Sequence, residues 1–163
     1  MKYLFVVLLF LFTLSGIIGQ DYTRWNTKGV FEEVEEEYQE ENVIEIFHHK
    51  KFQYFHDETG NLLLNDFIHR KFRLNSDNSI DRHNKIYVSL ASVIEMKEIK
   101  ARVIKPTGDV IEFDEDNIRE VEADEETGNY LIFALDGIET GDEIEYFIHT
   151  LKAGSNFGRV TYQ

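Results

Sequence analysis

Six histidines are the side chains in this sequence best suited to hold a metal ion. They are His48, His49, His56, His69, His83 and His149. Because His48 and His49 are adjacent, in a strand they point to opposite faces and do not easily share one ion. The sequence contains no His-x-His or HExxH pattern and no cysteine. Ordinary surface histidines are therefore the favoured interpretation, and a zinc site assembled from distant strands is the weaker alternative.

Carboxylates are abundant, but their spacing does not define a site. The stretch FDEDNIREVEADEE, residues 113–126, resembles a calcium-binding loop in charge alone. An EF-hand needs alternating acidic ligands, a central glycine and a final glutamate at fixed positions, and this spacing is absent. Paired carboxylates for glycoside hydrolysis cannot be singled out among so many acidic residues. The acidic stretches predict adventitious cation binding and no dedicated site.

The nucleophiles are equally uninformative. The sequence has no cysteine and no GxSxG turn, and Gly154 with Ser155 has no partner motif. The remaining glycines do not follow the spacing of a phosphate-binding loop. We therefore expect no catalytic residue, no cofactor and no metal, and a metal-dependent hydrolase is the least favoured class of function.

Aromatic side chains offer the last candidate chemistry. Phe47, Tyr54 and Tyr87, if exposed, would form a face that binds sugar or peptide. Aromatic residues in strands more often serve the sheet and the core, and that is the favoured interpretation.

Strands must position these side chains, because apolar and polar residues alternate from Val43 onward. Ile99, Ala101 and Val103, for example, alternate with charged residues. Loops between such runs are too short for crossover helices. Strand following strand predicts a mainly β domain over residues 43–163, an antiparallel β-sandwich or open barrel.

The only proline lies between two alternating runs in KARVIKPTGDVIEF, residues 100–113. Pro106 pre-sets φ at the second position of a β-turn, and Gly108 tolerates the strained position that follows. The stretch therefore predicts a β-hairpin.

Residues 20–42 form an acidic extension. Its stretch VFEEVEEEYQEE spaces Val30, Phe31, Val34 and Tyr38 so that they share one helical face. We expect a short amphipathic helix here.

The first 19 residues have the layout of a secretory signal peptide. Lys2 precedes an apolar run from Leu4 to Phe12, and small residues follow. The run is too short to span a membrane, so we expect cleavage after Gly19, with Gly16 as the second choice, and no membrane span afterwards. The mature chain keeps 16 basic and 31 acidic residues, and this net charge of −15 disfavours nucleic acid and anionic lipid.

Two turn-containing stretches resemble the paired signature of an uncharacterised exported β domain of Bacteroidetes and other Gram-negative bacteria. They are KARVIKPTGDVIEF and, at residues 133–148, FALDGIETGDEIEYFI. The matching residues are Lys105, Pro106 and Gly108 in the first stretch, and Gly137, Gly141, Asp142, Ile144, Glu145 and Tyr146 in the second. That family usually has proline where this chain has Asp136, and often another at Thr140, so the second loop is expected to be less rigid here.

The resemblance implies a position N-terminal to a transglutaminase-like domain of the same polypeptide, in the periplasm or at the cell surface. Transglutaminase-like chemistry uses a cysteine with a histidine and an acid, and this chain has no cysteine. The resemblance therefore implies a non-catalytic module that positions substrate or partner for a downstream domain, with a β domain that is incomplete at Gln163. The alternative is an independent carbohydrate- or peptide-binding module.

Overall fold

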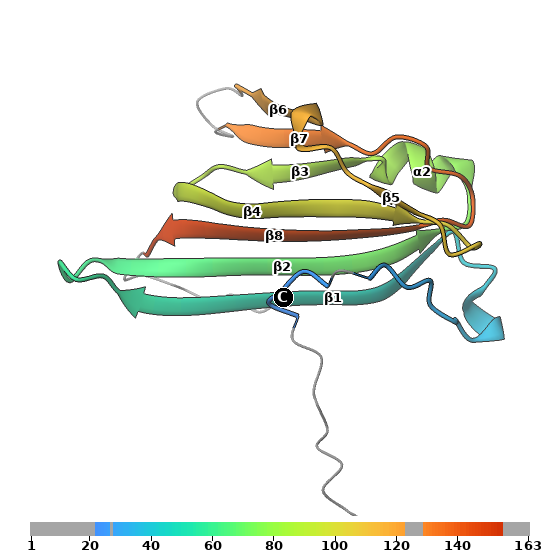
Figure 1. Cartoon of the computed structure of the whole chain (residues 1–163), viewed down its shortest axis with the longest axis horizontal. Coiled ribbons are helices and arrows are strands. Elements are labelled where there is room, and N and C mark those ends of the chain that lie inside the picture. The colour runs from blue at the N-terminus through green and yellow to red at the C-terminus, as the bar shows by residue number, and fades with distance from the viewer. Residues whose placement is uncertain (1–21, 27, 123–128, 155–163) are drawn as a thin grey trace, which may run out of the picture.

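The computed structural model describes residues 22–26, 28–122 and 129–154, which form two antiparallel sheets (Figure 1). The large sheet has the order β1 (Val43–His56), β2 (Leu62–Leu74), β8 (Glu143–Ala153), β4 (Val93–Ile104) and β5 (Val110–Glu112). The small sheet has the order β3 (Lys85–Ser89), β7 (Tyr130–Ala134) and β6 (Ile118–Val121). The helical elements are η2 (Glu36–Tyr38), α2 (Asp77–His83) and η3 (Glu115–Asn117).

Strand β8 holds the large sheet together, because it pairs antiparallel with both β2 and β4 although it follows them in the sequence. Ile144 of β8 lies opposite Phe72 on one side and Val103 on the other. The large sheet ends in the edge strands β1 and β5, so it is not closed into a barrel. The prediction of a mainly β, antiparallel, sandwich-like fold is confirmed.

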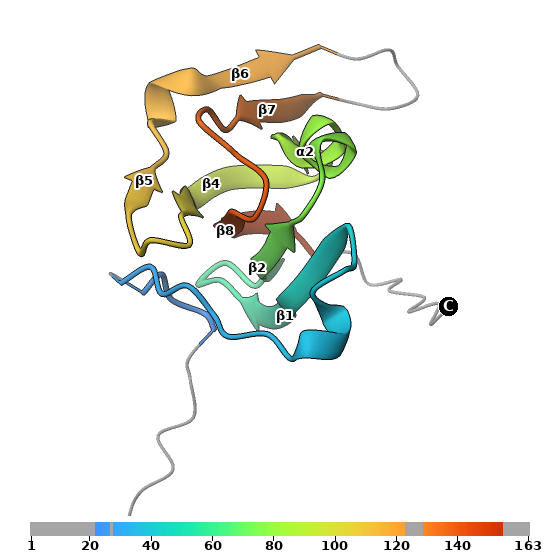
Figure 2. The same ribbon diagram turned by 90° about the vertical axis from the view of Figure 1, so that its right-hand side faces the viewer.

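A hydrophobic core lies between the two sheets, built from apolar residues that alternate along each strand. The large sheet contributes Phe72, Leu74, Ile99, Ala101, Val103, Ile144 and Ile148, and the small sheet with its adjoining loop contributes Ile86, Val88, Phe133 and Leu135. The small sheet and the N-terminal segment lie on opposite sides of the large sheet (Figure 2). Only one face of the large sheet therefore belongs to this core.

Helix α2 connects β2 to β3 and starts with a capping box. The hydroxyl of Ser76 accepts a hydrogen bond from the backbone N–H of Ser79, and the hydroxyl of Ser79 accepts one from the backbone N–H of Ser76. Two N–H groups that the helix leaves unpaired are satisfied in this way. The connection thus forms a helix of seven residues.

The N-terminal segment, residues 22–26 and 28–35, is here called the strap. It runs across the face of the large sheet that points away from the core (Figures 1 and 2). The prediction of an amphipathic helix in the stretch VFEEVEEEYQEE, residues 30–41, is wrong, since only Glu36–Tyr38 form a short 3-10 helix. An α-helix needs its own carbonyl oxygens for internal hydrogen bonds, and here side chains of the large sheet bind those of the strap.

Two expectations fall outside the described residues: the signal peptide with its cleavage after Gly19, and the continuation of the β domain towards Gln163. Among the residues that the structure does describe, no helix is long and apolar enough to cross a membrane.

Candidate functional site

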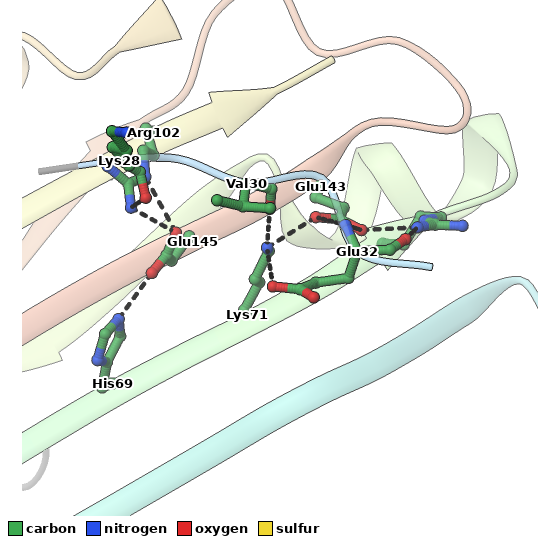
Figure 3. A network of polar contacts seen from close by, with 9 residues as sticks. Lys28, Val30, Glu32, His69, Lys71, Arg102, Glu143 and Glu145 are labelled. Carbon is green, nitrogen blue, oxygen red and sulfur yellow. Dashed lines mark hydrogen bonds and ion pairs between the residues drawn. The ribbon is translucent and has the colours of Figure 1, made fainter. Parts of the chain in front are cut away.

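Six polar residues lie side by side on the strap-covered face of the large sheet, and we call them the charged row. They are His69, Lys71 and Arg73 of β2, Arg102 of β4, and Glu143 and Glu145 of β8. Arg102 and Lys71 are the largest fully buried side chains in the described part of the chain. Buried charges need partners, and the charged row is built as two neighbouring clusters (Figure 3).

The first cluster centres on Glu143, whose carboxylate is fully buried between two cations. Its Oε2 lies 3.0 Å from Nζ of Lys71, and its Oε1 lies 2.7 Å from Nη2 of Arg73. The carboxylate is thus held by charge on both sides.

The second cluster centres on Glu145. Its Oε2 accepts a hydrogen bond from Nε of Arg102 at 3.0 Å and lies 2.9 Å from Nη2 of the same guanidinium, and its Oε1 lies 2.9 Å from Nε2 of His69. Burial opposes ionisation of this carboxyl, but the hydrogen bond from His69 and the charge of Arg102 outweigh burial and lower the pKa of Glu145 below its usual value. Because a carboxylate only accepts, Nε2 of His69 carries the proton.

The cations of the charged row bind backbone carbonyl oxygens of the strap at every second residue. Arg102 donates from Nη1 to the carbonyl of Asn26 and from Nη2 to that of Lys28, each at 3.0 Å. Lys71 donates to the carbonyl of Val30, and Arg73 donates to the carbonyl of Glu32. The contacts of Lys28, Val30 and Glu32 with the charged row are visible in Figure 3.

Glu143 completes this pattern by accepting a hydrogen bond from the backbone N–H of Glu32, at 3.1 and 3.3 Å from its two oxygens. In an extended chain the N–H and C=O of one residue point to the same side, and the next residue points to the opposite side. The strap therefore lies edge-on against the sheet, and the charged row contacts the main-chain groups of its even-numbered residues.

Two strap residues add side-chain contacts to this main-chain recognition, and a glycine between them allows a close approach. The guanidinium of Arg102 lies 4.3 Å from the ring centroid of Trp25, and that of Arg73 lies 4.1 Å from the ring of Phe31. A Cβ added to Gly29 would lie 3.0 Å from the side chain of Val110 and 3.1 Å from Nε of Arg102. Position 29 therefore favours glycine, because a larger residue would displace these side chains, while positions 25 and 31 favour an aromatic ring.

The turn residues singled out in the sequence meet at one end of the large sheet. They are Lys105, Pro106 and Gly108 between β4 and β5, and Gly137, Gly141 and Asp142 before β8. Gly108, Gly137 and Gly141 have φ values of +88°, +72° and +94°. Nζ of Lys105 donates to the carbonyl of Gly137 at 2.7 Å and to the carboxylate of Asp142 at 2.7 Å. The two sequence motifs are therefore in direct contact, next to Glu143 of the charged row.

The histidines do not come together as ligands. His49 stacks on Tyr22 at 3.4 Å between ring centroids, His83 contacts the backbone carbonyl of Ser79, and His149 contacts Asn65. Within the described ranges, no group of three or more His, Asp or Glu side chains is placed to hold a metal ion.

Sequence reasoning missed the charged row. A charged residue that alternates with core residues along a strand ordinarily faces solvent, and Lys71, Arg73 and Arg102 follow that pattern. Two signals were available in the sequence. Basic residues alternate with apolar ones along β2, and acidic residues do so along its partner β8. The N-terminal segment combines glutamates with aromatic residues.

Comparison with known proteins identifies the fold and a family. Residues 65–160 match one family, the Domain of Unknown Function with a solved structure, DUF3857. The crystal structure of "a putative protease from Parabacteroides distasonis ATCC 8503" is similar with a TM-score of 0.54 and 9% sequence identity over 72% of this chain. The similar part makes up 24% of that protein's chain, so the likeness is one of fold to a portion of a longer protein. No curated protein matches this chain.

Proposed function

The chain belongs to the DUF3857 family, and we propose that it is a non-catalytic, exported β module that holds an extended polypeptide segment on its charged row. In this role it positions a substrate or partner for a downstream transglutaminase-like domain of the same polypeptide.

The proposal rests on the hydrogen bonds that the charged row makes with alternate backbone carbonyls of the strap. Arg102, Lys71 and Arg73 donate to four main-chain oxygens, and Glu143 accepts from one main-chain N–H. Main-chain groups are common to all peptides, so this face is suited to an extended segment of varied sequence. The strap is the segment that occupies it here.

Two further observations support an accessory role. The chain has no cysteine, so thiol chemistry has to come from another domain. The protein with a similar fold is "a putative protease", and the shared fold makes up about a quarter of its length. A module that holds extended polypeptide suits a larger protein that acts on polypeptides.

The independent binding module is the second candidate, and it is favoured by exposed aromatic side chains. Tyr54 and Tyr87 are more than half exposed, as a face for sugar or peptide requires. The coding sequence after Gln163 discriminates the two candidates. A downstream cysteine, histidine and aspartate in that order favours the accessory module, and a stop codon favours the independent one.

The test of the peptide-holding face uses a full-length chain in which the strap is loosened. In Gly29→Val the new side chain collides with Arg102 and Val110, which should release the strap. Trp25 is the only tryptophan, so a red shift of its emission reports the release. A labelled peptide with the sequence of residues 22–35 should then bind to Gly29→Val, measured by fluorescence anisotropy, and bind at least tenfold more weakly to the unaltered chain.

Two controls define the result. The same peptide with valine at position 29, and a chain that also carries Arg102→Gln, should each bind at least tenfold more weakly. Release of Trp25 without any binding of the added peptide, or equal binding of a scrambled peptide, would contradict the proposal.

Export is tested separately by mass. The protein recovered from the periplasm is expected to begin at Gln20, and a stable full-length form that begins at Met1 in the membrane fraction would count against export.

A further inference from the structure

A cavity lies on the face of the large sheet opposite the charged row, where the free edge of β3 passes over β2 and β8. Its volume is about 190 Å³, and its apolar wall is formed by Ile68, Val88 and Ile148. Pockets for drug-sized ligands measure about 300–1,000 Å³, so this cavity suits a smaller molecule. Asp66 lines it and alternates along β2 with the charged row, so the two sites are separated by the sheet itself.

Asp66 is the feature of this cavity that calls for a ligand. Asp66 is only 4% exposed, and its Oδ2 accepts a hydrogen bond from Nζ of Lys152 at 2.7 Å. Its Oδ1 is buried and has no hydrogen-bond partner among the described residues. A buried carboxylate oxygen without a donor is unfavourable, and such a group points to a donor that a ligand brings.

The edge of β3 adds main-chain groups to the same cavity. Leu90 donates to the carbonyl of Asn129, and Leu135 donates to the carbonyl of Asn84, which fixes the hydrogen-bonding phase of β3 with β7. Residues 84, 86, 88 and 90 therefore point their N–H and C=O groups toward β7. The groups of residues 87 and 89 point away from β7, on the side where both residues line the cavity.

The cavity is lined by more positive than negative charge. Lys50 and Lys152 supply two ammonium groups, and Asp66 supplies one carboxylate. Lys50 forms no ion pair within the described residues, and its Nζ lies 5.1 Å from the ring centroid of Phe52. A matching ligand therefore carries a negative group for the lysines together with a hydrogen-bond donor, best a cation, for Oδ1 of Asp66.

We propose that this cavity binds a small α-amino acid in its zwitterionic form. The α-ammonium donates to Oδ1 of Asp66, the α-carboxylate lies between Lys50 and Lys152, and an apolar side chain contacts Ile68 and Ile148. A neutral sugar offers hydroxyl groups to the same atoms but leaves the two lysines without a negative partner.

The test is isothermal titration calorimetry of the full chain with L-leucine and L-phenylalanine as probes. At least one is expected to bind saturably, and L-glutamate, whose side chain is charged, is expected to bind more weakly. Blocking either charge of the bound amino acid, by N-acetylation or by amidation, should weaken binding at least tenfold. Glucose should not bind.

Variants tie the binding to the cavity. Asp66→Asn keeps the shape of the side chain and should weaken binding at least tenfold, and Lys50→Gln, at an exposed side chain, should weaken it several-fold. Lys97→Gln, which changes an exposed lysine paired with Glu95, is the matched control and should bind as the unaltered chain does. If Asp66→Asn loses the fold by circular dichroism, Lys50→Gln decides.

Three outcomes would overturn the proposal: none of the probes binds, the blocked derivatives bind as well as the free amino acid, or Lys50→Gln binds like the unaltered chain. The proposal is independent of the peptide-holding face. Amino-acid binding is expected to leave the emission of Trp25 unchanged, so either proposal can fail without the other.

Discussion

Nζ of Lys105 and Oδ2 of Asp142 lie 2.7 Å apart and join the two turns at one end of the large sheet. Asp142 is 1% exposed, and its Oδ2 also accepts a hydrogen bond from the backbone N–H of Glu139 at 2.7 Å. The next residue along the chain is Glu143, the centre of one cluster of the charged row. The Lys105–Asp142 pair therefore fixes the loop from which β8 and its buried glutamates start.

Replacing Lys105 by methionine should destabilise the fold by about 2–3 kcal/mol, because the buried carboxylate of Asp142 loses its cation. Burial opposes the charge of Lys105, but its hydrogen bonds to Asp142 and Glu139 raise its pKa above the usual value. Urea denaturation measures the loss. Lys100→Met is the matched control, because its pair with Glu115 is exposed, and should cost less than about 1 kcal/mol. Equal losses in the two variants would show that the joint between the turns is unimportant.

The lowered pKa of Glu145 predicts an acid limit of stability. A carboxyl whose pKa is lower in the folded than in the unfolded chain stabilises the fold fully above its usual value of 4.5. This contribution is lost as the pH falls below 4.5 through the lower pKa of the folded state. Denaturant melts across this pH range should show a steep decline in the free energy of unfolding, and the decline should be shallower in Glu145→Gln. An equally steep decline in Glu145→Gln would argue against an ionised Glu145.

Asp57, in the turn between β1 and β2, should titrate at unusually low pH. Hydrogen bonds from the side chains of Asn61 and Thr59 lower its pKa from 3.8 to about 2. A carboxyl-detected NMR titration should therefore give a midpoint near pH 2. Asn61→Ala should move the midpoint toward 3.8, and a midpoint already there in the unaltered chain would refute the hydrogen-bonded turn.

Gly108 should tolerate no β-branched side chain. Its φ is +88°, and an added Cβ would meet no atom within 4 Å, so the cost arises from the backbone alone. Gly108→Val is expected to lose about 1 kcal/mol or more in urea melts. Gly108→Asn should lose less, because asparagine tolerates this conformation better. A valine variant as stable as the unaltered chain would contradict the turn geometry.

The strands of the large sheet were predictable because their pattern is local. Ile99, Ala101 and Val103 alternate with charged residues, and the turn at Pro106 and Gly108 lies where the alternation stops. Both features depend on neighbours in the sequence, and such features are read directly from residue types.

The charged row and the strap were not predictable in the same way. Val30, Phe31, Val34 and Tyr38 have helical spacing. Yet the even-numbered residues from Asn26 to Glu32 have as partners side chains some 40 to 110 positions later in the chain. Bonds from those side chains to the strap carbonyls outweigh a weak local preference for helix. Whether Lys71 faces solvent or a buried carboxylate depends on these distant contacts alone.

The place of β8 between β2 and β4 has a consequence for the order in which the molecule is made. In a chain synthesised from its N-terminus, β2 and β4 are complete long before β8, the strand that lies between them, has been made. Until then β2 and β4 cannot join the same sheet, because they do not pair with each other. The charged row that binds the strap is also incomplete until then, since Glu143 and Glu145 belong to β8. Long separations between partners slow folding, so the pairing of β2 and β4 with β8 and the binding of the strap by its glutamates are expected to be late steps. The emergence of this one central strand thus sets when the large sheet can close.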